Sequence, residues 1–140
     1  MKKLIAPVTS IVMIALVNQS VHAGPANGTS PDPTFSTGGV FNQRSGKAIY
    51  EAVCAGCHML NGEGAKGAGF YPVLSKNPRL ASPAYPEYVV VHGLRGMPPI
   101  GPYLSDQQVA DVVTYIRTSF GNQYPDPVKI DDIAKIRTGK

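Results

Sequence analysis

The short segment CAGCH constrains this chain more than any other feature, because it contains both of its cysteines. Cys54 and Cys57 stand three positions apart, and His58 follows directly. The pattern C-x-x-C-H is typical of covalent haem attachment. The two thiols would add to the two vinyl groups of one haem, and the adjacent histidine would lie under the iron as its proximal ligand. The motif therefore predicts one covalently bound haem c.

Three other uses of the cysteine pair remain open from the residues alone. A redox-active pair of the thioredoxin type requires a βαβ setting, which the sequence pattern lacks. A zinc site requires four ligands, and the two cysteines with His58 and His92 have an unsuitable spacing. A structural disulfide would close a very tight loop and would leave the histidine of the motif without a role. Haem attachment accounts for all three residues of the motif.

Residues 1–23 have the three-part plan of a secretory signal peptide. Two lysines come first, an apolar run covers residues 4–17, and Ala23 provides a small residue before the expected cleavage site. The run is shorter than the roughly 20 residues that cross a bilayer, although an uncleaved anchor is the alternative. We expect a protein exported to the periplasm that does not span the membrane after signal cleavage.

The charge of the exported chain argues against a nucleic-acid partner. Two of the 13 basic residues leave with the signal peptide, so 11 remain against nine acidic residues. Nucleic-acid binding normally needs a cluster of Lys or Arg, which the sequence lacks. Fifteen glycines, 13 prolines and no tryptophan predict a small core with many turns.

The first half of the exported chain is expected to contain an arm and one helix. Residues 24–40 are rich in Gly, Pro, Ser and Thr and are expected to form a flexible arm. Ser45 suits the N-cap of a helix that would end near Cys54, with Cys57 just beyond it. The following glycine-rich stretch is expected to be loop, and no sheet is expected in the chain.

The second half is expected to contain three helices. A short one would have Pro86 at its first position and run through residues 89–91, where a strand is the alternative. The clearest begins with a capping box between Ser105 and Gln108 and is expected to end at Gly121. Its apolar face would carry Val109, Val112, Val113 and Ile116. Its polar face would carry Asp106, Asp111, Thr114 and Arg117. A C-terminal extension, residues 122–140, would contain a last short helix.

Residues 41–121 resemble the class I cytochromes c. The resemblance rests on AIYEAVCAGCH, on GMPP some forty residues later and on LSDQQVADVVTYIR after that. It implies an all-α class I cytochrome c fold around a single haem, in which the first and last long helices cross. Gly46 and Tyr50 would pack there against Val112 and Tyr115.

The sixth position of the iron has three candidate ligands. Met97 lies in an irregular loop, and the resemblance implies that it is the ligand, because GMPP matches the ligand loop of the family. Met59 follows His58 immediately and cannot reach the opposite face of the haem. His92 falls late in a helix, where a surface or propionate-side position is expected. With His58 and Met97 both bound, the iron would have no vacant position and could only exchange an electron.

The resemblance also implies three residues around the haem. Pro72 would accept, through its carbonyl, the other ring proton of His58. Leu74 would pack on the haem. Arg95 could pair with a haem propionate or remain a solvated loop charge.

In function, the resemblance implies a periplasmic electron carrier that is not itself an enzyme. The stretch HGLRGMPPI, the helix after it and the helical tail are similar to haem domains that accept electrons from exported dehydrogenases. The donor would be a periplasmic dehydrogenase, and the acceptor a membrane oxidase or another cytochrome of the respiratory chain. A haem enzyme or gas sensor with an open sixth position is the alternative. A module of terminal oxidase or denitrification machinery is a second one.

Overall fold

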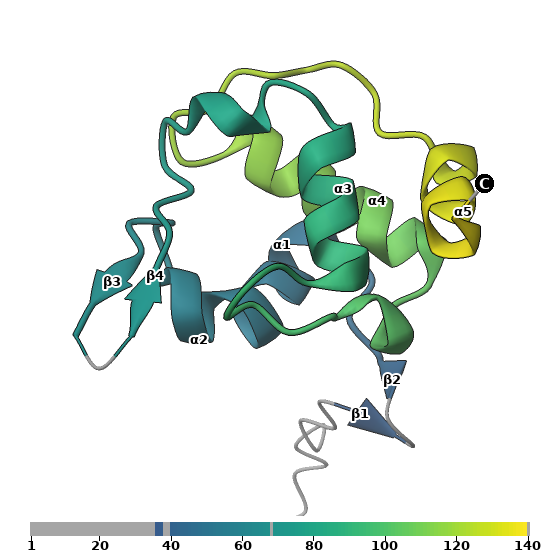
Figure 1. The fold of residues 1–140 in the computed structure, drawn as a ribbon, viewed down its shortest axis with the longest axis horizontal. Helices are drawn as coiled ribbons and strands as arrows, with labels where there is room; N and C mark the ends of the chain where they lie inside the picture. The colour runs from purple at the N-terminus through teal and green to yellow at the C-terminus, as the bar shows by residue number, and fades with distance from the viewer. Residues whose placement is uncertain (1–35, 38–39, 68, 140) are drawn as a thin grey trace, which may run out of the picture. The chain divides into compact units, whose positions relative to one another are not determined.

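The computed structural model describes residues 36–37, 40–67 and 69–139 (Figure 1). The signal peptide expected over residues 1–23, and most of the arm expected over residues 24–40, lie outside this part of the chain. No helix within the described residues has both the length and the apolar character that a membrane span needs.

The described residues are mostly helical, which confirms the expected cytochrome c fold. The α-helices are α1 (Gly46–Ile49), α2 (Ala55–His58), α3 (Ala84–His92), α4 (Asp106–Thr118) and α5 (Ile130–Thr138). A π-helical turn, η1 (Tyr50–Cys54), joins α1 to α2, and the 3-10 turns η2 (Pro78–Leu80) and η3 (Gly101–Tyr103) precede α3 and α4. The expectation of no sheet is wrong, because two short antiparallel hairpins pair β1 (Ser36–Thr37) with β2 (Val40–Phe41) and β3 (Ala65–Lys66) with β4 (Phe70–Tyr71).

The haem-motif helix runs without a break through α1, η1 and α2, and it is longer than predicted. Ser45 caps it as expected, since its hydroxyl accepts a hydrogen bond from the Ala48 amide at 3.2 Å. Cys57 lies inside α2 rather than beyond the helix. The helix ends at His58, because the next residue, Met59, has a φ of 63°, and the Met59 carbonyl accepts a hydrogen bond from the Tyr50 hydroxyl at 2.6 Å. The helix end at His58 is therefore fixed by a buried tyrosine.

Helices α1 and α4 pack closely at Gly46. A Cβ atom at Gly46 would lie 2.1 Å from the Asp111 carbonyl oxygen and 2.8 Å from the Tyr115 Cβ. One turn later the Tyr50 ring packs on Tyr115 and Phe120, with centroids 5.6 and 4.8 Å apart. The predicted packing of Gly46 and Tyr50 against this part of α4 is confirmed.

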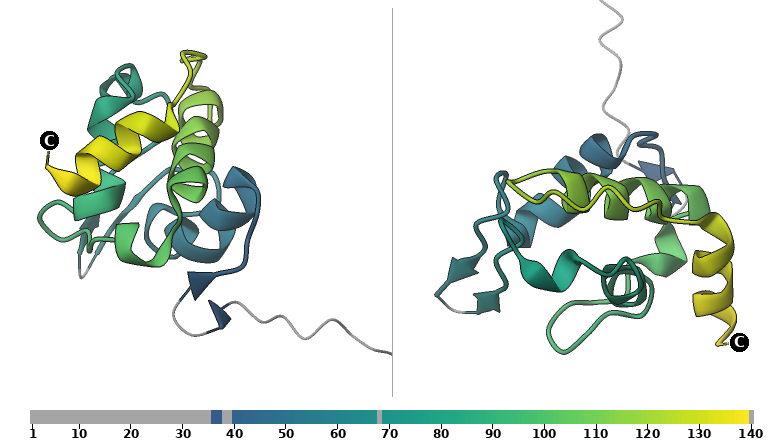
Figure 2. Two further views of the ribbon diagram at one scale, coloured as in Figure 1. Left: turned by 90° about the vertical axis from the view of Figure 1, so that its right-hand side faces the viewer. Right: turned by 90° about the horizontal axis from the view of Figure 1, so that it is seen from above.

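The prediction that Arg117 lies on a polar face of α4 is wrong. Its side chain is fully buried, because η2 and the segment that follows α4 pack over it. This segment returns along α4 toward α5 (Figure 2). The guanidinium donates to the carbonyls of Leu80 and Ala81, each at 2.9 Å, and to the carbonyl of Asp126. Backbone carbonyls from two distant segments thus accept hydrogen bonds from the Arg117 guanidinium, which the helical pattern predicted to be exposed to solvent.

The ends of the other helices differ from the predicted ones. The helix expected at residues 89–91 is present, but α3 begins at Ala84, two residues before the Pro86 predicted to be its first residue, and Pro83 is its N-cap. The capping box of α4 is confirmed, with both Ser105–Gln108 hydrogen bonds formed. Helix α4 ends at Thr118, before Gly121, because Ser119 already has an extended backbone, with a φ of −115° and a ψ of 175°.

Candidate haem-binding site

The two cysteines lie on one continuous helix, three residues apart, and neither forms a disulfide. Cys54 is half-buried and packs against the core, whereas Cys57 is exposed. Burial, with a smaller effect from Cys57, raises the pKa of the Cys54 thiol to about 12. A reactive cysteine of the thioredoxin type needs a lowered pKa, so this environment does not suit that use. Within the described residues, no group of three or more His, Cys, Asp or Glu could hold a metal ion.

His58 is buried, and its orientation is fixed by Pro72. Its Nδ1–H donates to the Pro72 carbonyl at 2.9 Å, which is the contact that the resemblance implied. Because Nδ1 carries this proton, Nε2 is the ring nitrogen with a lone pair for a metal. Ligating histidines usually donate their other ring nitrogen to a carbonyl or carboxylate in this way.

The loop that brings Pro72 to His58 depends on two glycines that the sequence pattern did not single out. Gly64 has a φ of +64°, and a Cβ there would lie 2.4 Å from the Tyr71 carbonyl oxygen and 2.9 Å from that of Pro72. The Gly62 carbonyl accepts from the amides of Leu74 and Ser75 at 2.7 and 2.9 Å. A glycine-rich stretch directly after a haem motif was the available signal, although it indicated only a loop.

Met97 lies in a tight turn directly after α3. Its amide and carbonyl exchange hydrogen bonds with Leu94, both at 3.0 Å. Gly93 permits this turn, because it has a φ of +72° and a Cβ there would lie 2.5 Å from the Met97 carbonyl oxygen. Arg95 occupies the turn with a φ of 55° and is exposed. The Met97 side chain is half-buried and packs against the core, as does that of Leu74.

The other two candidate ligands are placed differently. His92 is the last residue of α3, is exposed, and donates from Nε2–H to the Ile136 carbonyl of α5 at 2.9 Å. Its ring also packs on Tyr88, with centroids 4.9 Å apart. Met59 directly follows His58, and its carbonyl is held by Tyr50. His92 is therefore already engaged by α5.

These residues fit a covalently bound haem. Two free thiols share one helix, and the histidine after them has one ring nitrogen committed to a carbonyl and the other available. A thioether comes from a different segment, the turn after α3. Seen from above, this turn and α2 lie in separate layers of the fold (Figure 2). The donor set suits iron, because imidazole and thioether are its axial ligands in cytochromes c.

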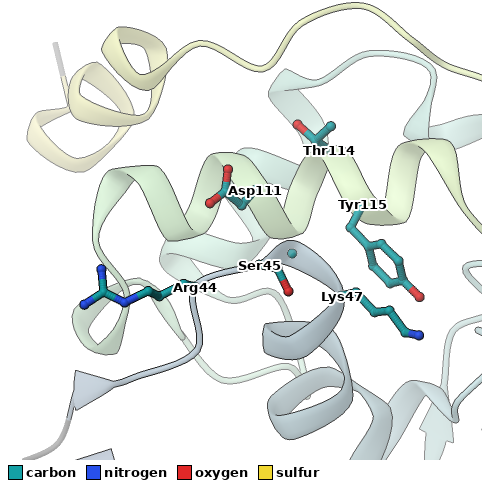
Figure 3. A pocket seen from close by; sticks show the side chains of 7 residues that line it. Arg44, Ser45, Lys47, Asp111, Thr114 and Tyr115 are labelled. Atoms are coloured by element: carbon teal, nitrogen blue, oxygen red, sulfur yellow. The ribbon is translucent and has the colours of Figure 1, made fainter.

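A shallow hollow of about 400 Å³ lies elsewhere, where the start of α1 meets α4 (Figure 3). Its lining includes the cations Arg44 and Lys47 and the side chains of Asp111, Thr114 and Tyr115. None of the haem-site residues lines it, and it is widely open to solvent. We assign it no part in the candidate site.

Comparisons with known proteins agree with the geometry. Residues 41–116 match the family model described as "Cytochrome C oxidase, cbb3-type, subunit III". The chain is 36% identical over 105 residues to the alcohol dehydrogenase (quinone) cytochrome c subunit of Gluconacetobacter polyoxogenes, a match covering 66% of the chain and 22% of the relative. It is 34% identical over 110 residues to the fructose dehydrogenase cytochrome subunit of Gluconobacter japonicus, covering 67% and 22%. It is 31% identical over 110 residues to the gluconate 2-dehydrogenase cytochrome c subunit of Pantoea cypripedii, covering 69% and 24%. The matched part thus spans less than a quarter of each relative.

Proposed function

Because the chain belongs to the cytochrome c family of the cbb3-type oxidase subunit III model, we propose that it is an exported single-haem electron carrier. One observation supports this above all. His58 directly follows a segment with two free thiols, and its side chain is buried. Its Nδ1–H donates to the Pro72 carbonyl, so that Nε2 can ligate iron. When bound, the haem supplies reversible one-electron chemistry.

In this proposal each residue of the site has a separate task. Cys54 and Cys57 would attach the haem, and His58 and Met97 would ligate its iron. Ligation by both imidazole and thioether would raise the reduction potential and would exclude oxygen and peroxide from the iron. Leu74 packs on the haem, Pro72 orients His58, and Arg95 pairs with a propionate. The last role rests on the position of Arg95 in the same turn as Met97.

We further propose that the donor is a periplasmic dehydrogenase and that the acceptor is a membrane oxidase or another cytochrome of the respiratory chain. The three relatives named above are cytochrome subunits of alcohol, fructose and gluconate dehydrogenases, which supports a dehydrogenase partner. Substrate oxidation would take place on another polypeptide, so the chain would be an electron-transfer subunit and not an enzyme by itself.

Carbon monoxide distinguishes the carrier from a haem enzyme or gas sensor. The exported holoprotein should contain one haem per chain, be reduced and reoxidised reversibly, and bind no carbon monoxide when reduced. Met97→Ala should retain its haem and bind carbon monoxide, whereas Met59→Ala should behave like the wild type. Rapid binding by the wild type would show an open sixth position and would favour the alternative.

Oxygen uptake by intact cells tests the proposed partner. Deletion of the chain should abolish uptake driven by one of three substrates, namely an alcohol, fructose or gluconate. Uptake driven by NADH in membranes from the same cells is the control and should remain. Unchanged rates with all three substrates would contradict a dehydrogenase of these classes as the donor.

A further inference from the structure

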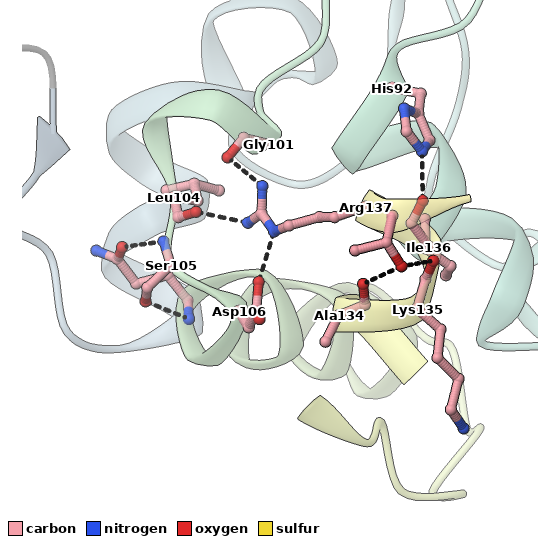
Figure 4. Close-up of polar contacts among 11 residues, drawn as sticks. His92, Gly101, Leu104, Ser105, Asp106, Ala134, Lys135, Ile136 and Arg137 are labelled. Carbon is pink, nitrogen blue, oxygen red and sulfur yellow. Dashed lines mark hydrogen bonds and ion pairs between the residues drawn. The ribbon is translucent and has the colours of Figure 1, made fainter. Parts of the chain in front are cut away.

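Helix α5 contacts both ends of the segment that carries Met97. At the start of the segment, the Nε2–H of His92 donates to the Ile136 carbonyl at 2.9 Å. At its end, the next residue of α5, Arg137, donates from Nη1 to the Gly101 carbonyl at 2.8 Å and from Nη2 to the Leu104 carbonyl at 2.6 Å (Figure 4). Two consecutive residues of the C-terminal helix therefore bracket residues 93–104.

The contacts of α5 with the segment are made by one backbone carbonyl, that of Ile136, and by the guanidinium of Arg137. Near the end of α5 the Ile136 carbonyl accepts the Gly139 amide at 3.3 Å, and its second lone pair accepts the hydrogen bond from His92. Arg137 uses all three of its nitrogens, because its Nε also donates to the Asp106 carboxylate at 2.5 Å. Asp106 is the first residue of α4, so Arg137 ties η3 and α4 together. Its side chain is only 26% exposed, which limits the screening of these contacts by solvent.

Between the two ends, the segment is held by its own turn and by a hydrogen bond to α3. Met97 exchanges two hydrogen bonds with Leu94, and the Ile100 amide donates to the Val90 carbonyl at 3.1 Å. Two prolines after Met97 restrict the backbone further. The place of the Met97 sulfur relative to the rest of the fold is then set by these contacts together with the Arg137 hydrogen bonds at the end of the segment.

We infer that Arg137 is a positioning residue for Met97, and that α5 keeps the thioether in place as the sixth ligand. This inference rests on the proposed function, because it requires Met97 to be that ligand. Its consequence is local: loss of the Arg137 contacts raises the fraction of molecules in which the segment has opened, without removing any ligand. Segments of a folded protein open separately in this way when few contacts hold them.

The test is the rate at which the oxidised holoprotein binds cyanide, because cyanide can enter only after Met97 has left. Arg137→Ala should bind cyanide on the order of tenfold faster than the wild type, since hydrogen bonds from charged groups are the stronger ones in a protein. Arg137→Lys keeps the charge but loses the planar fork, so its rate should lie between the two. Lys135→Ala is the matched control on the same helix and should keep the wild-type rate. Within the described residues, the Lys135 ammonium forms one hydrogen bond, to the Asp132 carboxylate of α5 at 3.0 Å.

Two outcomes would overturn the inference, and they can be told apart. If Arg137→Ala is less stable to denaturant but binds cyanide at the wild-type rate, Arg137 supports the fold without positioning Met97. If Arg137→Ala does not yield a folded holoprotein, Arg137→Lys takes its place. Cyanide binding by Arg137→Lys at the wild-type rate would then show that Arg137 does not position Met97. If the wild-type protein itself lacks the Met–Fe(III) charge-transfer band, the ligand assignment in the proposed function fails, and this inference fails with it.

Discussion

Replacement of Gly46 by alanine tests the helix packing that positions the haem motif. The added Cβ would lie 2.1 Å from the Asp111 carbonyl oxygen and 2.6 Å from its carbon, whereas ordinary contacts begin at 3.4 Å. Both atoms belong to the α4 backbone, so α1 and α4 must separate by about 1 Å. Overpacking of this kind costs about 1–3 kcal/mol, and a backbone obstacle favours the upper end. Alanine recovers at most about 1 kcal/mol of helix propensity.

We therefore expect Gly46→Ala to lower the free energy of unfolding by about 2 kcal/mol and the Tm by roughly 8–16 °C. The assay is denaturant unfolding of the exported holoprotein, in which the midpoint should fall while the slope stays constant. Gly56→Ala is the matched control on the same continuous helix, because a Cβ there would meet no heavy atom of the described residues within 4 Å apart from its chain neighbours and the backbone of its own helix. It should stabilise the protein by about 0.5–1 kcal/mol. Equal midpoints for the two variants would refute this account of the helix packing.

The remaining predictions concern two buried charges and the haem attachment. Arg117→Ala should lower the free energy of unfolding by about 3–5 kcal/mol, because it leaves buried carbonyls without their donor; a loss below about 1 kcal/mol in denaturant unfolding would contradict the burial. Burial, together with the charge of Asp132, raises the pKa of Glu87 despite the opposing charge of Arg117. The contribution of Glu87 to stability should therefore be fully present below its unfolded pKa of about 4.3 and be lost as the pH rises through its folded pKa. Glu87→Gln should raise the Tm at pH 7 but not at pH 4, and an equal shift at both would contradict this. Cys54→Ala and Cys57→Ala should each weaken covalent haem retention, measured by haem staining of the denatured protein, and undiminished staining of the double variant would exclude haem c.

Features that depend on neighbours in the sequence could be predicted before the structure. The capping box of α4 needs only Ser105 and Gln108, and the apolar stripe follows from the helical repeat. The packing of Gly46 on α4 was implied by the resemblance to the class I cytochromes c, and a glycine allows this close approach because it has no side chain. The haem motif is equally local, because Cys54, Cys57 and His58 act from one helix.

Features that depend on distant segments could not be predicted in this way. Arg117 is buried because Leu80, Ala81 and Asp126 bring carbonyls to it, and no helical periodicity contains that information. The length of the haem-motif helix depends on Tyr50 reaching the Met59 carbonyl. The hairpins pair strands of only two residues each, too short for an alternating pattern to show. The bracket formed by α5 likewise joins residues that are far apart in the sequence.

The most direct test of the central claim is the absorption spectrum of the oxidised wild-type holoprotein, compared with that of Met97→Ala. We expect one haem per chain and a weak Met–Fe(III) charge-transfer band, which disappears in Met97→Ala while the haem remains attached. The band should persist in Met59→Ala. A band that survives Met97→Ala, or a low-spin spectrum that Met97→Ala retains and His92→Ala loses, would contradict the assignment of His58 and Met97 as the axial pair.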